Sequence, residues 1–129
     1  MGVTLTRDLI LEANDLKREQ VEIPEWGGTV YVRGLTGAER DAFEASINAD
    51  GGQGKIQNVR ARLVAFTVVD ENGNRIFSDA DAGILGRKSA NALNRVFEVA
   101  LRLNGIGNKE VEALAKNSNP EPSGDSVSV

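Results

Sequence analysis

Residues 89–104 carry the clearest pattern in the sequence, and it is the pattern of an amphipathic α-helix. Apolar side chains recur there at intervals of three and four residues, which places them on one face of a helix. Gly105 follows at the position where glycine commonly caps a helix C-terminus. Such a helix must bury its apolar face, so the rest of the chain has to supply elements that cover it. The apolar positions are Leu93, Val96, Phe97, Ala100 and Leu101.

Capping motifs predict two further helices. Thr36 and Glu39 form a capping box, in which the hydroxyl accepts the Glu39 amide and the carboxylate reaches back to the start of the helix. That helix should end near Asn48, because residues 50–54 contain too many glycines to stay helical. A second capping signature, at residues 78–81, opens a short helix that runs through Leu85. The first helix should bury Ala38, Ala42, Phe43, Ser46 and Ile47.

Periodicity predicts three more helical segments. Thr6 can cap a short helix near the N-terminus, with Leu9, Ile10 and Ala13 as its apolar stripe and its end near residues 14–15. Residues 55–67 repeat apolar side chains at spacings of three and four. Residues 109–116 can add a last short helix.

A β-hairpin is expected over residues 19–34. Val21 and Ile23 alternate with polar residues, and Val30 and Val32 do so again after the turn, which is the period of half-buried strands. Pro24 stops the first strand, and the sequence Trp26-Gly27-Gly28 supplies the turn. Residues 67–77 leave two alternatives open. They form a small second hairpin, or the preceding helix runs to Val69 and only a turn follows.

These elements predict a mainly α protein with a small antiparallel β-hairpin, an α+β fold. With 129 residues, 40% apolar and 26% charged, the chain suits one globular domain, assigned to residues 1–116. Residues 117–129 are polar and contain two of the three prolines, so they are expected to be a disordered C-terminal tail. Two strands are not stable alone in water, so the hairpin must pack on helices or pair with another copy.

Several classes of chemistry lack the residues that they need. The chain has no cysteine and no histidine, which removes the usual zinc ligands and the usual general base. No enzyme activity, metal or cofactor is therefore expected. A net charge of −4 argues against a nucleic-acid surface, and no segment is apolar enough to span a membrane. Residues 70–81 weakly resemble a calcium loop, but Arg75 stands where glycine is needed.

Binding to another protein is the remaining class of function, and Trp26 is the first candidate residue for it. At a hairpin tip it either covers its own subunit or anchors a partner, where Trp, Tyr and Arg are favoured residue types. Tyr31 and Arg33 join it as protein-interaction candidates, because they lie on the opposite face of the strand from Val30 and Val32.

The chain resembles the tail assembly chaperones of long-tailed (siphovirus-type) bacteriophages over about residues 3–105. The resemblance is carried by VEIPEWGGTVYVRGLTGAERDAFEA (21–45) and VVDENGNRIFSDADAGILGRKSANALNRVFEVALRLNG (68–105). Its most specific parts are the EWGG turn, RGLTGAERDAFE and DENGNRIFSDAD. None of these is a catalytic signature, so the likeness is that of a whole domain.

That resemblance implies a small, mainly helical protein of the host cell cytoplasm that is absent from the mature virion. Such chaperones self-associate and coat the tape-measure protein, which stays soluble while tail subunits assemble around it. Many also occur in a longer, frameshifted form, whose added domain recruits the major tail (tube) protein. A structural virion component, such as a tail or head–tail connector subunit, is the main alternative. A small accessory or regulator of an enzyme is the third.

Residues Ala115-Lys116-Asn117 suggest where a frameshift could occur. This tripeptide is compatible with a slippery codon run, and it stands where the predicted domain gives way to the predicted tail. Slippage there would replace residues 118–129 with a longer extension.

Overall fold

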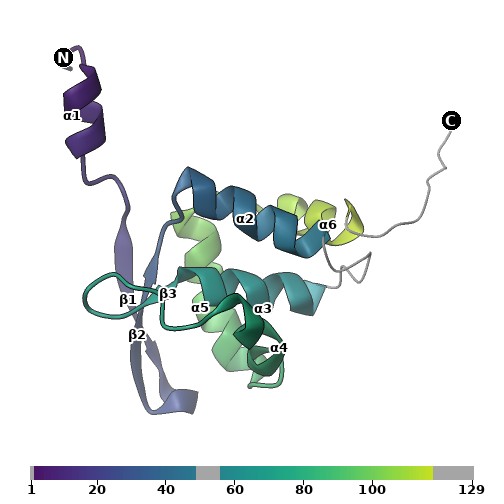
Figure 1. The fold of residues 1–129 in the computed structure, drawn as a ribbon. Helices are drawn as coiled ribbons and strands as arrows, with labels where there is room; N and C mark the ends of the chain where they lie inside the picture. The colour runs from purple at the N-terminus through teal and green to yellow at the C-terminus, as the bar shows by residue number, and fades with distance from the viewer. Residues whose placement is uncertain (1, 49–55, 118–129) are drawn as a thin grey trace, which may run out of the picture.

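The computed structural model describes residues 2–48 and 56–117, which form six α-helices, a three-stranded sheet and two short 3-10 turns. The expected α+β fold is confirmed (Figure 1). In chain order the elements are α1 (Arg7–Glu12), β1 (Arg18–Ile23), η1 (Pro24–Trp26), β2 (Gly28–Arg33), α2 (Gly37–Asn48), α3 (Ile56–Thr67), β3 (Val68–Val69), η2 (Asp79–Asp81), α4 (Ala82–Leu85), α5 (Ala90–Leu103) and α6 (Asn108–Asn117).

The predicted hairpin is present as β1 and β2. The two strands pair antiparallel, with Arg18 opposite Arg33 at one end and Ile23 opposite Gly28 at the tip. β3 adds to the other side of β2, so the sheet has the order β1-β2-β3 and β1 lies at its edge. Ile23 and Val32 are fully buried, because the sheet packs one face against α5. The hairpin therefore packs on a helix, as expected for a sheet this small.

Residues 67–77 form a small hairpin, which was the first of the two alternatives, with few residues in its strands. α3 ends at Thr67, and Val68 and Val69 pair with β2 instead of continuing the helix. After a turn, Arg75 forms a single β-bridge with Val69. The Asp70 carboxylate accepts the amides of Asn72 and Asn74 at 2.8 and 3.0 Å and so holds the turn. Two further backbone hydrogen bonds close this hairpin, from the Asp70 amide to the Asn74 carbonyl at 2.8 Å and from the Ile76 amide to the Val68 carbonyl at 3.4 Å.

α5 and α3 form the centre of the core. The five apolar residues predicted for the face of α5 are all buried, and Ala92 joins them. Ser89 caps the helix by accepting the Ala92 amide, and Gly105 adopts a φ of +64° just past its end. α3 lies across α5 and is buried almost throughout its second half. The strongest sequence pattern thus predicted both the helix and the face that it buries.

α2 begins with the predicted capping box, and its buried face is narrower than predicted. The Glu39 amide donates to the Thr36 hydroxyl at 3.1 Å, and the Thr36 amide donates to the Glu39 carboxylate at 3.0 Å. Phe43 and Ile47 are buried. The Phe43 ring packs edge-on against Phe66 of α3, with the ring centroids 5.9 Å apart. The prediction was wrong for Ala38 and Ala42, which are exposed. α2 lies on the surface of α3 and buries only the side that faces it.

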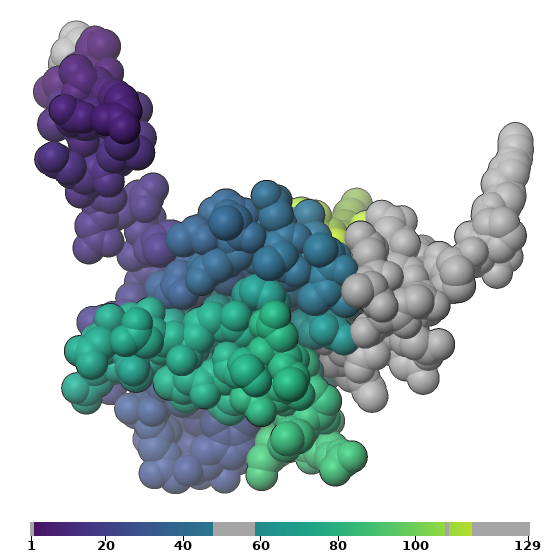
Figure 2. Space-filling view, in the orientation of Figure 1, coloured from purple at the N-terminus to yellow at the C-terminus, as the bar shows by residue number. Residues whose placement is uncertain are grey.

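α1 forms at the predicted place and is capped by Thr6, whose hydroxyl accepts the Leu9 amide. Its apolar stripe covers nothing, since no residue of α1 is buried. The helix projects from the body beyond the start of β1 (Figures 1 and 2). We call residues 2–13 the N-terminal arm.

α6 covers the predicted last helix and packs on α2 and α3. Arg40 of α2 forms an ion pair with Glu110 of α6 at 3.1 Å. The predicted disordered tail, apart from Asn117 at the end of α6, lies outside the described residues.

Candidate protein-interaction site

The hairpin tip is shaped by Pro24 and Gly27. Pro24 ends β1 and opens the 3-10 turn η1, in which the Gly27 amide donates to the carbonyls of Ile23 and Pro24 at 3.1 Å. Gly27 has a φ of +78°, in the left-handed region that side chains with a Cβ avoid. This turn directs Trp26 away from the strands and toward the segment that contains α4.

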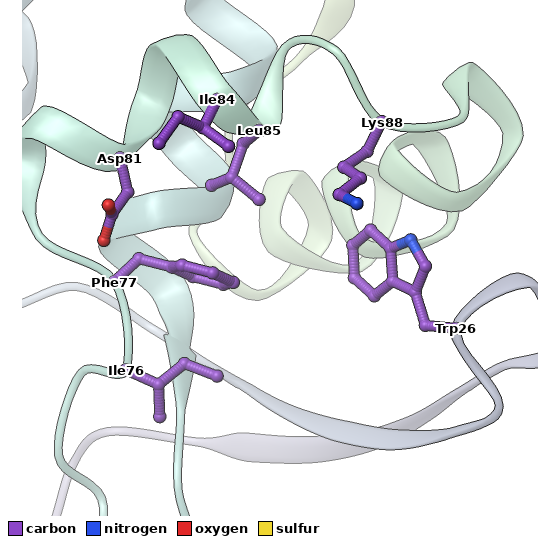
Figure 3. A pocket seen from close by; sticks show the side chains of 7 residues that line it. All are labelled: Trp26, Ile76, Phe77, Asp81, Ile84, Leu85 and Lys88. Carbon is purple, nitrogen blue, oxygen red and sulfur yellow. The ribbon is translucent and has the colours of Figure 1, made fainter.

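Trp26 forms one wall of an open pocket of about 490 Å³ (Figure 3). Phe77 and Leu85 line the inner part, and the Lys88 side chain points toward the indole. Trp26 itself is half-buried and packs against the core. The indole thus covers part of the core of its own subunit, beside α5, and still presents a surface to solvent. The lining residues are Trp26, Ile76, Phe77, Asp81, Ile84, Leu85 and Lys88.

Ion pairs hold the hairpin against α5. Arg95 donates to the Glu25 carboxylate at 3.0 Å, next to Trp26, and Arg102 donates to Glu19 of β1 at 2.9 Å. In each case the hydrogen bond from the arginine lowers the pKa of the glutamate. Both pairs are partly exposed, so their main effect is to orient the hairpin on the helix.

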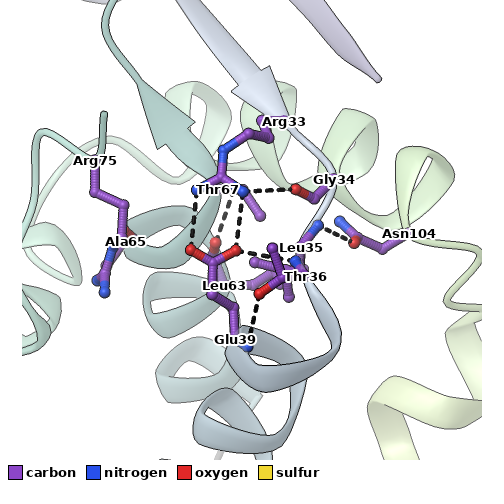
Figure 4. A network of polar contacts seen from close by, with 10 residues as sticks. All are labelled: Arg33, Gly34, Leu35, Thr36, Glu39, Leu63, Ala65, Thr67, Arg75 and Asn104. Carbon is purple, nitrogen blue, oxygen red and sulfur yellow. Dashed lines mark hydrogen bonds and ion pairs between the residues drawn. The ribbon is translucent and has the colours of Figure 1, made fainter. Parts of the chain in front are cut away.

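Tyr31 and Arg33 do not join Trp26 in one site. Tyr31 is half-buried, with the Arg18 guanidinium 4.5 Å from the centre of its ring. Arg33 lies at the end of the hairpin away from the tip, where it forms a two-pronged ion pair with Glu39 at 2.9 and 3.0 Å (Figure 4). This ion pair lowers the Glu39 pKa to about 2. Only 12% of the Arg33 side chain is exposed, so the residue is poorly placed to contact a partner.

The exposed apolar residues gave no recognisable signal of their exposure in the sequence. In the described part of the chain, the large hydrophobic side chains that are exposed fall in two places, the N-terminal arm and the rim of the Trp26 pocket. The apolar spacing of α1 was visible, but the pattern alone could not show that no core lies opposite it. Ile76 and Ile84 gave no signal, because isolated apolar residues in short elements are ordinary. The arm residues are Val3, Leu5, Leu9, Ile10 and Leu11, and the rim residues are Ile76 and Ile84.

The described residues offer little for other kinds of site. Within 2–48 and 56–117 no group of three or more acidic side chains could hold a metal ion. In the weakly calcium-like segment, Arg75 donates to the Ala65 carbonyl at 3.1 Å and to Asp79 at 3.0 Å (Figure 4 shows the Ala65 contact). No helix in this part of the chain has the length and apolar content to cross a membrane.

A small α+β domain with two exposed apolar sites has the properties of a protein-binding module. A family model described as phage tail assembly chaperone matches residues 5–117, and the chain belongs to this family. The match includes α6 and so extends past the resemblance read from the sequence. Membership assigns the chain a role in phage tail assembly. Comparison with curated proteins and with solved structures gave no match.

Proposed function

We propose that this chain self-associates and coats the tape-measure protein during tail assembly. The observation that carries the proposal is the family match over residues 5–117. The exposed apolar side chains of the arm and the pocket rim support it, because a long helical client needs its apolar faces covered. Many weak contacts of this kind would keep the client soluble and still allow tail subunits to displace the chaperone.

The proposal places the chain in the host cell cytoplasm, without enzyme activity, and outside the finished particle. We also propose that residues 1–116 are the folded unit and that a longer, frameshifted form carries an additional domain that recruits the major tail protein. Ala115-Lys116-Asn117 is the proposed point of slippage. The coding DNA tests this directly: codons that do not form a slippery heptamer at these positions would exclude it.

Co-expression with the tape-measure protein tests the main role. We expect the fraction of soluble tape-measure protein to rise when this chain is present, and the two proteins to purify together. An equally insoluble client with and without the chain would contradict the proposal.

Mass spectrometry of purified particles tests the location. A chaperone leaves before the tail is complete, so the chain should be absent from finished tails. Its presence there at the copy number of a tail component would favour a structural subunit instead.

A further inference from the structure

The arm and the pocket are the two exposed apolar sites in the described part of the chain, and they complement each other. In the arm, Leu9 is 47%, Ile10 55% and Leu11 65% exposed, and no side chain of the helix is buried. At the pocket, Ile76 is 50% and Ile84 59% exposed. Each site thus consists of apolar surface with nothing covering it in the single chain.

The charges of the two sites are also complementary. The pocket is lined by one basic residue, Lys88, and one acidic residue, Asp81. The arm carries Asp8 and Glu12, which can face the lysine. Arg7 of the arm pairs with Asp8 at 3.1 Å, and Asp81 of the pocket accepts the Ser78 amide at 2.8 Å. An apolar helix of this length with both signs of charge therefore fits an apolar pocket bordered by both signs.

The arm is poorly placed to reach the pocket of its own chain. It leaves β1 at the end opposite the hairpin tip, where Trp26 stands (Figure 1). The six residues of β1 span about 20 Å. Centring the arm helix at the tip would therefore require the linker of residues 13–17 to be almost fully extended, at about 18 Å. The arm of a second copy can approach the pocket without this limit on the length of the linker.

We propose that the arm of one copy docks in the Trp26 pocket of a second copy. This inference deepens the self-association in the proposed function and rests on it. Burying one aliphatic side chain removes roughly 60–120 Å² from water. Two exchanged arms bury about twice the area of one arm, which moves the contact toward the roughly 1,200–2,000 Å² of a stable interface. A single arm falls short of that area, so exchange between two copies is favoured.

Crosslinking of the pure protein tests the contact directly. The chain contains no cysteine, so single cysteines can be placed freely. We expect a mixture of Leu9→Cys and Ile84→Cys proteins, treated with a short bis-maleimide, to give a covalent dimer in high yield. A mixture of Leu9→Cys with Ala45→Cys, at an exposed position of α2, is the matched control and should give little. Equal yields from the two mixtures would overturn the proposal.

Oligomeric state provides a second readout that does not depend on crosslinker geometry. Deleting residues 2–12 removes no buried side chain, so the body should still fold as judged by circular dichroism. Light scattering should then find a monomer at concentrations where the full chain associates. Ile84→Asp should weaken association at least about tenfold, because it places an unpaired charge against apolar side chains. Ala45→Asp adds the same charge elsewhere and should leave association unchanged.

Other results would exclude this contact. Unchanged association after arm deletion would show that another surface joins the copies. A crosslink confined to one chain, in a Leu9→Cys/Ile84→Cys double variant that stays monomeric, would show that the arm folds back on its own pocket. Loss of tape-measure binding on arm deletion, with association intact, would make the arm a client-binding element. The crosslinking uses this chain alone, so it can succeed or fail independently of the tape-measure experiment.

Discussion

At the start of α2 the carboxylate of Glu39 accepts hydrogen bonds from two parts of the chain. It caps the helix by accepting the Thr36 amide, and it accepts both terminal nitrogens of Arg33 from the end of β2. One side chain thus connects the sheet to the first helix that follows it. The Arg33 hydrogen bonds are the largest cause of its low pKa.

Replacing Glu39 should change how stability depends on pH. A carboxylate whose pKa falls on folding stabilises the folded state above its unfolded pKa. That contribution is lost as pH falls from about 4.5, the ordinary value, toward about 2. Glu39→Gln should therefore lower the free energy of unfolding at pH 7 by about 1–3 kcal/mol, and the difference from wild type should shrink below pH 4. Urea unfolding at several pH values measures this.

A matched substitution makes the pH test specific. Glu98→Gln removes an exposed carboxylate on α5 and should leave the pH profile close to that of wild type. If Glu39→Gln and wild type instead stay equally far apart from pH 7 to pH 2, the ion pair does not have the assigned effect.

The two glycines after Trp26 should respond differently to alanine. Gly27 has a positive φ, which costs an alanine roughly 1–2 kcal/mol, whereas Gly28 begins β2 with ordinary backbone and open space around its Cα. Gly27→Ala should lower the free energy of unfolding by about that amount, and Gly28→Ala should leave it nearly unchanged. Thermal unfolding of both variants measures the difference. Equal losses would show that the turn does not need the left-handed conformation.

At the scale of the elements, the end of α5 holds the connection between β2 and α2. The Asn104 side chain accepts the Leu35 amide at 2.7 Å and donates to the Ala100 carbonyl at 2.8 Å. The bond with Leu35 joins residues that are 69 positions apart in the sequence. The same connection is held on its other side by the Gly34 amide, which donates to the Lys17 carbonyl at 2.9 Å.

Removing the Asn104 side chain should loosen this junction. Asn104→Ala leaves the Leu35 amide without its partner, which should cost about 1–3 kcal/mol of folding stability. Asn91→Ala, at an exposed position on the same helix, is the control and should cost little. Chemical denaturation compares the two. If both variants unfold at the same denaturant concentration, water replaces the lost bond fully.

The sequence predicted the helices and strands better than it predicted which of them pack together. Capping boxes and the α5 pattern were recognisable because they depend on residues three or four positions apart. The exposure of Ala42, the pairing of β3 with β2 and the position of Trp26 across a pocket from α4 depend on segments far apart in the chain. No local sequence pattern shows which distant segments will lie next to each other. The Trp26 pocket was missed for the same reason, since Phe77 and Leu85 come from another part of the sequence.

At the scale of the whole molecule, folding leaves the apolar residues of the arm outside the core. The body buries its core around α3 and α5, and the arm contributes nothing to it. The stability of the single chain should therefore be nearly independent of the arm. The stability of an assembly should depend on it strongly, because association stabilises only the folded state.

Thermal unfolding at several protein concentrations separates these two contributions. The full chain should unfold at higher temperature as its concentration rises. The gain should be about 1.4 kcal/mol per dimer, or about 0.7 kcal/mol per chain, for each tenfold increase above the dissociation constant. The chain without residues 2–12 should show no such dependence and should match the full chain at high dilution. A concentration dependence that survives the deletion would contradict this expectation.

The edge strand β1 bears on how the protein resists aggregation at high concentration. An unpaired strand edge invites further strands, and uncontrolled growth of that kind ends in fibrils. Along β1 the exposed positions are Arg18, Gln20 and Glu22, so a second β1 laid beside it parallel and in register would place like charges side by side. A protein that exposes apolar surface thus has a sheet edge whose charges discourage in-register, amyloid-like stacking.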